Sequence, residues 1–118
     1  MTHDFIVSHC VSVRAAHGHA DAVGEGMARL LEATSRADGC LHASLHRGHH
    51  ESGHWMLHGQ WADQGHMNRH FASPAMTIFS QMIGDRLVAH IDAQTFKPNG
   101  RAQPCAAPAD SQTLGRYI

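Results

Sequence analysis

The sequence has 118 residues, thirteen histidines and a formal net charge of −1, and a chain of this length forms one domain around one core. Its hydrophobic content of 42% and charged content of 16% are typical of a soluble globular protein rather than a disordered or fibrous one. The charge argues against a nucleic-acid partner, because the clustered Lys/Arg excess that binds phosphates is missing.

Residues 5–14 alternate between apolar and polar side chains, which predicts a half-buried strand. One face of this strand is apolar except for a single histidine and carries Phe5, Val7, His9, Val11 and Val13. Residues 19–37 then repeat apolar side chains at helical spacing, which predicts a helix. Gly39 supplies the left-handed residue that ends this helix.

The middle of the chain predicts a β-hairpin. Residues 40–47 and 54–61 have the alternation of two strands, and the six residues between them, "GHHESG", suit a hairpin loop. One face of the hairpin should lie against the helices, and it carries Leu41, Ala43, Leu45, Trp55, Leu57, Gly59 and Trp61. Gly59 beside Trp61 is expected to leave open space on that face.

Six of the thirteen histidines fall in this hairpin and raise the question of a metal site. A turn near its centre would place His46 opposite His54 and His42 opposite His58, on the face away from the helices. Each cross-strand pair offers two ligands about 5 Å apart at Cβ, whereas zinc needs three or four. A third ligand would have to come from another strand or from a partner subunit. We therefore predict no metal site, and we expect these histidines to fill a moderately polar interface.

The second helical region should have two parts. Asp63 can cap a short helix that runs to about residue 72, and Ser73 with Pro74 can begin another helix that Gly84 ends. His66 and His70 share one face of the first part, but without a glutamate between them or a third ligand we do not expect them to bind a metal.

Residues 88–96 alternate again and predict a final strand. Residues 1–96 would then form the domain, and residues 97–118 a tail without a core, whose last stretch, "TLGRYI", could pair with a sheet edge. The order βαββαβ predicts an α+β, ferredoxin-like fold with a four-stranded antiparallel sheet and helices on one face. Because so small a chain cannot cover the other sheet face, we expect a homodimer.

The three cysteines, Cys10, Cys40 and Cys105, are widely spaced and form no CxxC motif, which fits reduced thiols better than disulfides. The first ten residues lack the features of a signal peptide, and no stretch approaches the roughly 18 apolar residues of a membrane span. We therefore expect a cytoplasmic protein without a membrane partner.

Two stretches together resemble a known family. "ADGCLHASL" lies at the first helix-to-strand junction, and "GQWADQGHMNRHFASPAM" follows a strand that ends in tryptophan. They are similar to the antibiotic biosynthesis monooxygenase domain, which shows E-x-G-C-L, then E-x-W or E-W, then H-x-x-S-P on a βαββαβ fold that dimerises into an α+β barrel. The resemblance covers roughly residues 5–96, and Asp38 and Gln60 stand where relatives often have glutamate.

The resemblance implies oxygenation by O₂, without metal, flavin or other cofactor, of small electron-rich aromatics such as hydroquinones or anthrones. His70 would be the proton acceptor or an anion-stabilising donor, and Trp61 would supply the flat wall of the pocket. Further contacts to the substrate would come from His9, Leu57, Gly59, His66, Phe71 and Arg86. Haem-degrading relatives carry an asparagine on the first strand and a histidine on the last helix, and the absence of both here disfavours a haem oxygenase.

Two other functions remain open at this point, because one fold hosts unrelated activities. The first is a non-catalytic dimer that binds a small aromatic molecule or a transition metal. The second is a structural interaction module, which would be favoured if the space beside Gly59 proved to be filled.

Overall fold

The computed structural model describes residues 5–98. Its elements are, in chain order, β1 (Val7–Ala15), α1 (Ala20–Arg36), β2 (Cys40–Arg47), β3 (His54–Trp61), α2 (Gln64–Phe71), the 3-10 helix η1 (Pro74–Met76), α3 (Thr77–Gly84) and β4 (Val88–Phe96). This order confirms the βαββαβ prediction. Strands β2, β3 and β4 have the predicted bounds, and β1 and α1 differ from the prediction by only one or two residues at their ends.

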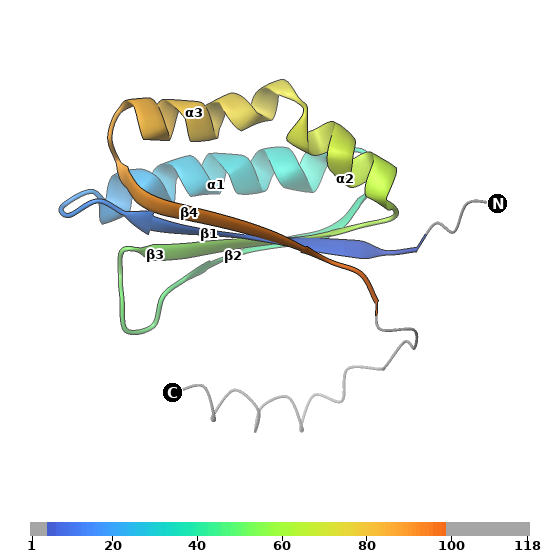
Figure 1. The fold of residues 1–118 in the computed structure, drawn as a ribbon, viewed down its shortest axis with the longest axis horizontal. Helices are drawn as coiled ribbons and strands as arrows, with labels where there is room; N and C mark the ends of the chain where they lie inside the picture. Colours follow the sequence, from blue (N-terminus) through green and yellow to red (C-terminus); the bar gives the residue numbers. More distant parts are fainter. Residues whose placement is uncertain (1–4, 99–118) are drawn as a thin grey trace.

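The four strands form one antiparallel sheet in the order β2-β3-β1-β4. All the helices of residues 5–98 lie on the same side of this sheet, which gives one helical layer over one sheet, and no other element of these residues covers the opposite sheet face (Figure 1). The predicted ferredoxin-like α+β fold is confirmed.

The helix-facing side of the sheet packs against α1 and α3 to form the main core. Its buried members, each no more than 2% exposed, are Val11, Val13, Val23, Met27, Leu30, Leu57 and Met82. A smaller cluster of Val7, Trp61 and Met67 lies where β3 ends and α2 follows. Phe71 packs against both clusters, so α2 is fixed over this end of the sheet.

The residues predicted as helix signals lie at or near the helix ends. Gly39 has the left-handed φ, 84°, that glycine adopts without a steric penalty, but it does not itself end α1. The helix ends at Arg36, with Ala37 already extended, and Gly39 lies in the turn that the Cys40 N–H closes by donating to the Ala37 carbonyl at 3.1 Å. The Asp63 carboxylate accepts the N–H of His66 at 2.9 Å and so caps α2. Pro74 is the first residue of η1, but the Ser73 side chain caps nothing and instead donates to the carbonyl of His70 at 2.6 Å.

The predicted register of the hairpin is wrong by two residues. His42 lies opposite Gln60, and His46 lies opposite Met56, so no histidine faces another directly. The reason lies in the loop, where the Gly48 N–H donates to the His54 carbonyl at 2.6 Å. This bond moves the centre of the turn toward β3, so each residue of β2 pairs two positions later in β3 than predicted. A shift of two residues keeps every side chain on its predicted face.

Leu41 does not lie against the helices as predicted. A bulge between Cys40 and His42 places Cys40 opposite Trp61, and Cys40 packs against the smaller core cluster. Leu41 is 52% exposed as a result. A bulge inserts one residue into a strand, and alternation alone does not reveal it.

We call the uncovered side of the sheet the open face. Its central residues on β1 and β3 are Ser8, Cys10, Ser12, Arg14, His54, Met56, His58 and Gln60, and β2 adds His42, Ser44 and His46. The closest pair of its histidine rings is diagonal, with 6.4 Å between the centroids of His42 and His58. Nowhere in residues 5–98 are three His, Cys, Asp or Glu side chains grouped so that they could hold a metal ion.

Cys10 and Cys40 are free thiols, whereas Cys105 and the "TLGRYI" stretch lie outside the described residues. Most of the predicted tail lies outside them too, so its role stays a prediction. Within residues 5–98, no helix has the length and apolar character needed to cross a membrane.

Candidate active site

Trp61 and His9 form a buried pair on the helix-facing side of the sheet. Trp61 ends β3 and is 0% exposed, and His9 lies on β1 and is 1% exposed. The indole Nε1 of Trp61 donates to Nδ1 of His9 at 2.9 Å, so the neutral imidazole of His9 carries its proton on Nε2. That Nε2 is buried and has no partner among residues 5–98.

The expectation of open space beside Gly59 is wrong. Gly59 lies directly opposite His9 on the neighbouring strand, and a Cβ at this position would lie 2.3 Å from Cε1 of the His9 ring. The imidazole therefore occupies the space that the missing side chain leaves. Gly59 provides the room that the His9 ring of the His9–Trp61 pair occupies.

We expect Gly59→Ala to lower the free energy of unfolding by about 1–3 kcal/mol, the usual cost of overpacking a core. The added methyl group would displace the His9 ring and weaken its hydrogen bond to Trp61. Urea unfolding measures the effect, and Gly84→Ala is the control, because a Cβ at Gly84 meets nothing within 4 Å. Equal stability of the two variants would contradict this packing.

His70 lies on the other side of Trp61. It is 5% exposed, and its ring centroid is 5.0 Å from that of Trp61, so the structure brings together the two residues that the sequence singled out. Nε2 of His70 is 3.0 Å from the hydroxyl of Thr34 on α1, which is fully buried. The bond from Ser73 to the His70 carbonyl holds the backbone at the same point.

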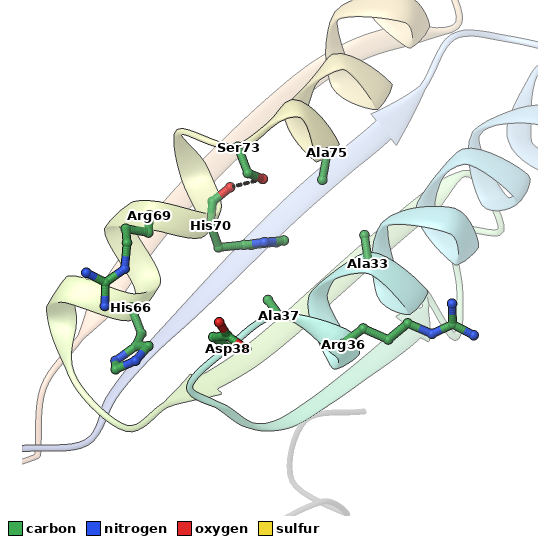
Figure 2. Close-up of a pocket in the computed structure, with 9 residues that line it drawn as sticks. All are labelled: Ala33, Arg36, Ala37, Asp38, His66, Arg69, His70, Ser73 and Ala75. Atoms are coloured by element: carbon green, nitrogen blue, oxygen red, sulfur yellow. Dashed lines mark hydrogen bonds between the residues drawn. The ribbon is translucent and has the colours of Figure 1, made fainter.

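A cavity of about 330 Å³ opens between the end of α1 and α2, and His70 extends into the gap between the two helices (Figure 2). Its lining consists of Ala33, Arg36, Ala37, Asp38, His66, Arg69, His70, Ser73 and Ala75. Trp61 does not line it, because the indole is completely buried. The expected flat wall is therefore formed by His70, and Trp61 packs behind it.

The cavity carries two arginines and one carboxylate. Arg36 and Arg69 lie on opposite sides of it, with Asp38 near its lower edge (Figure 2). His66 lines the cavity beside them, and its Nδ1 lies 2.8 Å from the carboxylate of Asp63. Arg36 pairs with Glu32 on α1, with 3.6 Å between the guanidinium and the carboxylate, so Arg69 is the main source of positive charge for an anionic ligand in this lining.

Both buried histidines are held neutral. The pKa of His9 is lowered from 6.5 to about 4, mainly because burial disfavours the charged imidazole, and also because His70 and His58 lie nearby. Burial also lowers the pKa of His70. His70 is thus an uncharged imidazole at neutral pH, able to accept a proton on one nitrogen or donate one from the other.

The other residues expected at the site are in different places. Phe71 contacts the His9 ring edge-on, with 4.9 Å between centroids, whereas Leu57 belongs to the main core. Arg86 lies between α3 and β4, next to Leu87. The Leu87 carbonyl accepts a hydrogen bond from the N–H of Ala16, which follows the last residue of β1. Trp61 pairs with the first residue of that strand, so Arg86 lies at the opposite end of the sheet from the cavity.

Sequence reasoning missed Thr34, Arg36 and Arg69 as site residues. Thr34 falls among the apolar side chains that repeat at helical spacing in residues 19–37, where its hydroxyl carries no signal of its own. Ala33 and Ala37 do give a sequence signal for a cavity, because small residues one helical turn apart leave room on a helix face. They open the cavity opposite His70.

The deciding comparison is with protein families. A family model described as antibiotic biosynthesis monooxygenase matches residues 6–81. The chain belongs to the antibiotic biosynthesis monooxygenase family. The match includes Thr34, Trp61 and His70, and it confirms the resemblance seen in the sequence motifs.

Solved structures show the same fold as this antibiotic biosynthesis monooxygenase family member. PA3566 from Pseudomonas aeruginosa is 22% identical, with a TM-score of 0.73 over 83% of this chain and 98% of that chain. A variant of SnoaB from Streptomyces nogalater, a cofactor-independent oxygenase, is 16% identical, with a TM-score of 0.70 over 84% and 98%. Rv0793 from Mycobacterium tuberculosis is 16% identical, with a TM-score of 0.71 over 83% and 99%. No curated protein matches the chain.

Proposed function

We propose that this protein is a cofactor-independent monooxygenase that acts on small electron-rich aromatics, such as quinols and anthrone-like phenols. Membership of the antibiotic biosynthesis monooxygenase family supports the reaction type. One observation about the site carries the proposal: a neutral imidazole, His70, forms the inner wall of a cavity of about 330 Å³. This volume is at the small end of ligand pockets, which run from about 300 to 1,000 Å³, and it suits a small aromatic molecule.

The chemistry requires a substrate that can become an anion. A phenol or anthrone that loses a proton gives an electron-rich anion, which passes one electron to O₂, and the two radicals combine to form a peroxide. For an anthrone, the CH₂ carbon then becomes a carbonyl, one oxygen atom stays in the product, and the other leaves as water with the two hydrogens of that carbon. The protein has to bind the substrate, stabilise its anion and limit the access of water.

Oxygen uptake tests the proposal. Purified protein, freed of metals by exhaustive chelation, is mixed with a panel of hydroquinones and anthrones in an oxygen electrode, and the product is identified by mass. We expect O₂ consumption well above the spontaneous rate, with one oxygen atom gained by each product molecule per O₂ consumed, which for an anthrone is one new carbonyl. Uptake no faster than the spontaneous rate across the panel would contradict the proposed function.

A second candidate is a non-catalytic protein of the same fold that binds a small aromatic molecule or a metal. The burial of Trp61 favours it, because the indole is not open to a reacting substrate. The filled space beside Gly59 instead favours the third candidate, a structural interaction module. Titration of the same aromatics by calorimetry separates the two candidates. Binding without O₂ uptake identifies a binding protein.

The functional unit of our proposal is a homodimer in which two open faces pack together. Within residues 5–98, no helix covers this side of the sheet (Figure 1). It carries apolar side chains among its polar ones, with Phe96 50% exposed opposite Ser8 and Met56 opposite Ser12. A second copy of the chain would bury both.

Light scattering after size exclusion, at about 10 µM protein, should give twice the mass of the chain. Met56→Glu should reduce it to the monomer mass, because it would place a charge at the centre of the buried face. Ile83→Glu should not, because Ile83 is exposed on α3, on the other side of the sheet. A monomeric wild-type protein would refute the dimer.

A further inference from the structure

Thr34 is a buried hydroxyl with one hydrogen-bond partner. It lies on α1 and is 0% exposed, so no water reaches it. In a helix interior, a threonine hydroxyl often donates to the carbonyl four residues earlier, but among the described residues the single hydrogen bond of the Thr34 hydroxyl is with Nε2 of His70, at 3.0 Å. The direction of this bond decides which nitrogen of His70 carries the proton.

Only one direction of the Thr34–His70 hydrogen bond gives the hydroxyl proton of Thr34 an acceptor. If Nε2–H donated to Thr34, the hydroxyl proton of Thr34 would have no acceptor in a fully buried position, which costs the desolvation of that group. If Thr34 donates to Nε2, the hydroxyl is satisfied, and the proton of the neutral imidazole must be on Nδ1. The geometry therefore favours the Nδ1–H tautomer of His70.

Nδ1 of His70 is the nitrogen that reaches the cavity. It makes no hydrogen bond within the described part of the chain, and it is not among the fully buried unpaired atoms there, of which His9 Nε2 is the single example. His70 lines the cavity and its side chain extends into it (Figure 2), so the ring nitrogen that is not bonded to Thr34 is the one available to a ligand there.

We propose that Thr34 is a positioning residue that fixes His70 as an Nδ1–H donor, and that the cavity therefore binds the oxyanion of a phenol. The binding of a phenol oxyanion rests on the proposed function. An Nδ1–H donor makes His70 the group that stabilises the anion, and not the proton acceptor. His70 stabilises the phenolate by a charge-assisted hydrogen bond, and the proton of the phenol leaves to bulk water through the open cavity. Arg69 adds positive charge to the same cavity, whereas the charge of Arg36 is shared with Glu32.

The tautomer can be observed directly. Protein labelled with ¹⁵N in its histidine rings is studied by long-range ¹H–¹⁵N correlation at about pH 7.5, where imidazoles are largely neutral. The His70 signals are assigned by their loss in His70→Asn. We expect the proton on Nδ1 in the wild type and in Thr34→Ser, and loss of this preference in Thr34→Val, which is similar in shape but has no hydroxyl. A wild-type His70 protonated on Nε2 overturns the proposal.

The binding role is tested with a nitrophenol, whose phenolate is coloured, and its methyl ether. We expect the wild type and Thr34→Ser to bind the phenolate about 10-fold more tightly than Thr34→Val, the usual share of one charge-assisted hydrogen bond. The ether should bind all three proteins equally. Equal phenolate affinity in wild type and Thr34→Val, with both folded by circular dichroism, overturns the role of Thr34.

These measurements do not depend on turnover. If His70 is the Nδ1–H tautomer and nitrophenolate binds as expected, but no phenol is oxygenated, the proposed function fails and the assignment of Thr34 stands. If phenols are oxygenated but His70 carries its proton on Nε2, the reverse holds, and His70 acts as the base.

Discussion

Replacing His70 by alanine should lower kcat for O₂ uptake by about 10²-fold or more, the usual share of one positioned catalytic group. The His70 imidazole, whose pKa is lowered by burial, lies both against Trp61 and at the wall of the cavity. Its loss would leave the developing anion of the substrate without its hydrogen-bond donor. Initial rates with the best substrate of the hydroquinone and anthrone panel measure the effect.

Two controls make this result specific. His50→Ala removes an exposed histidine of the hairpin loop and should leave kcat unchanged. His70→Gln keeps a side-chain amide that can donate to the substrate, and it should recover part of the lost rate, which a purely structural role would not explain. A kcat of His70→Ala within a factor of about 3 of the wild type would show that His70 has no part in the chemistry.

Stability should fall as the solution becomes acidic, and His9 should dominate the loss. Its pKa is about 4 in the folded protein and 6.5 as a free side chain, so the unfolded chain binds more protons between these values. The stabilising contribution is complete above about pH 6.5 and decreases as the pH falls, by about 2 kcal/mol at pH 5. The lowered pKa values of His70 and His58 act in the same direction.

Urea unfolding between about pH 7.5 and pH 5 measures this loss, in a range above the titration of ordinary carboxylates. His9→Gln should show a smaller loss, because the amide can still accept the N–H of Trp61 and does not titrate. His50→Ala should show the full wild-type loss. A wild-type free energy of unfolding that is constant over this range would contradict the burial of a neutral His9.

Much of the fold could be predicted because its signals are local. The alternation of residues 88–96, the left-handed Gly39 and the cap at Asp63 each depend on a few neighbouring residues. The register of the hairpin and the bulge at Cys40 depend instead on how the loop closes and how the strand end packs. These are tertiary effects that change pairing without changing the alternation.

The site was predictable in part for the same reason. Trp61 and His70 could be placed on one layer from strand and helix periodicity, and the structure does bring them together. The sequence could not show that His9 fills the space beside Gly59 or that Thr34 reaches His70, because both contacts join distant segments of the chain. The cavity that the structure does contain at this site is lined by His70 and not by Trp61, which is completely buried.

The most direct test of the central claim follows the oxygen atoms. Metal-free wild-type protein and the anthrone that it consumes fastest are incubated under dioxygen labelled with ¹⁸O, and the quinone product is examined by mass spectrometry. A monooxygenase of the kind proposed should place one labelled atom in each product molecule, and His70→Ala should form that product about 10²-fold more slowly. Product oxygen that comes from water, or a rate equal to that of the reaction without protein, would contradict the account.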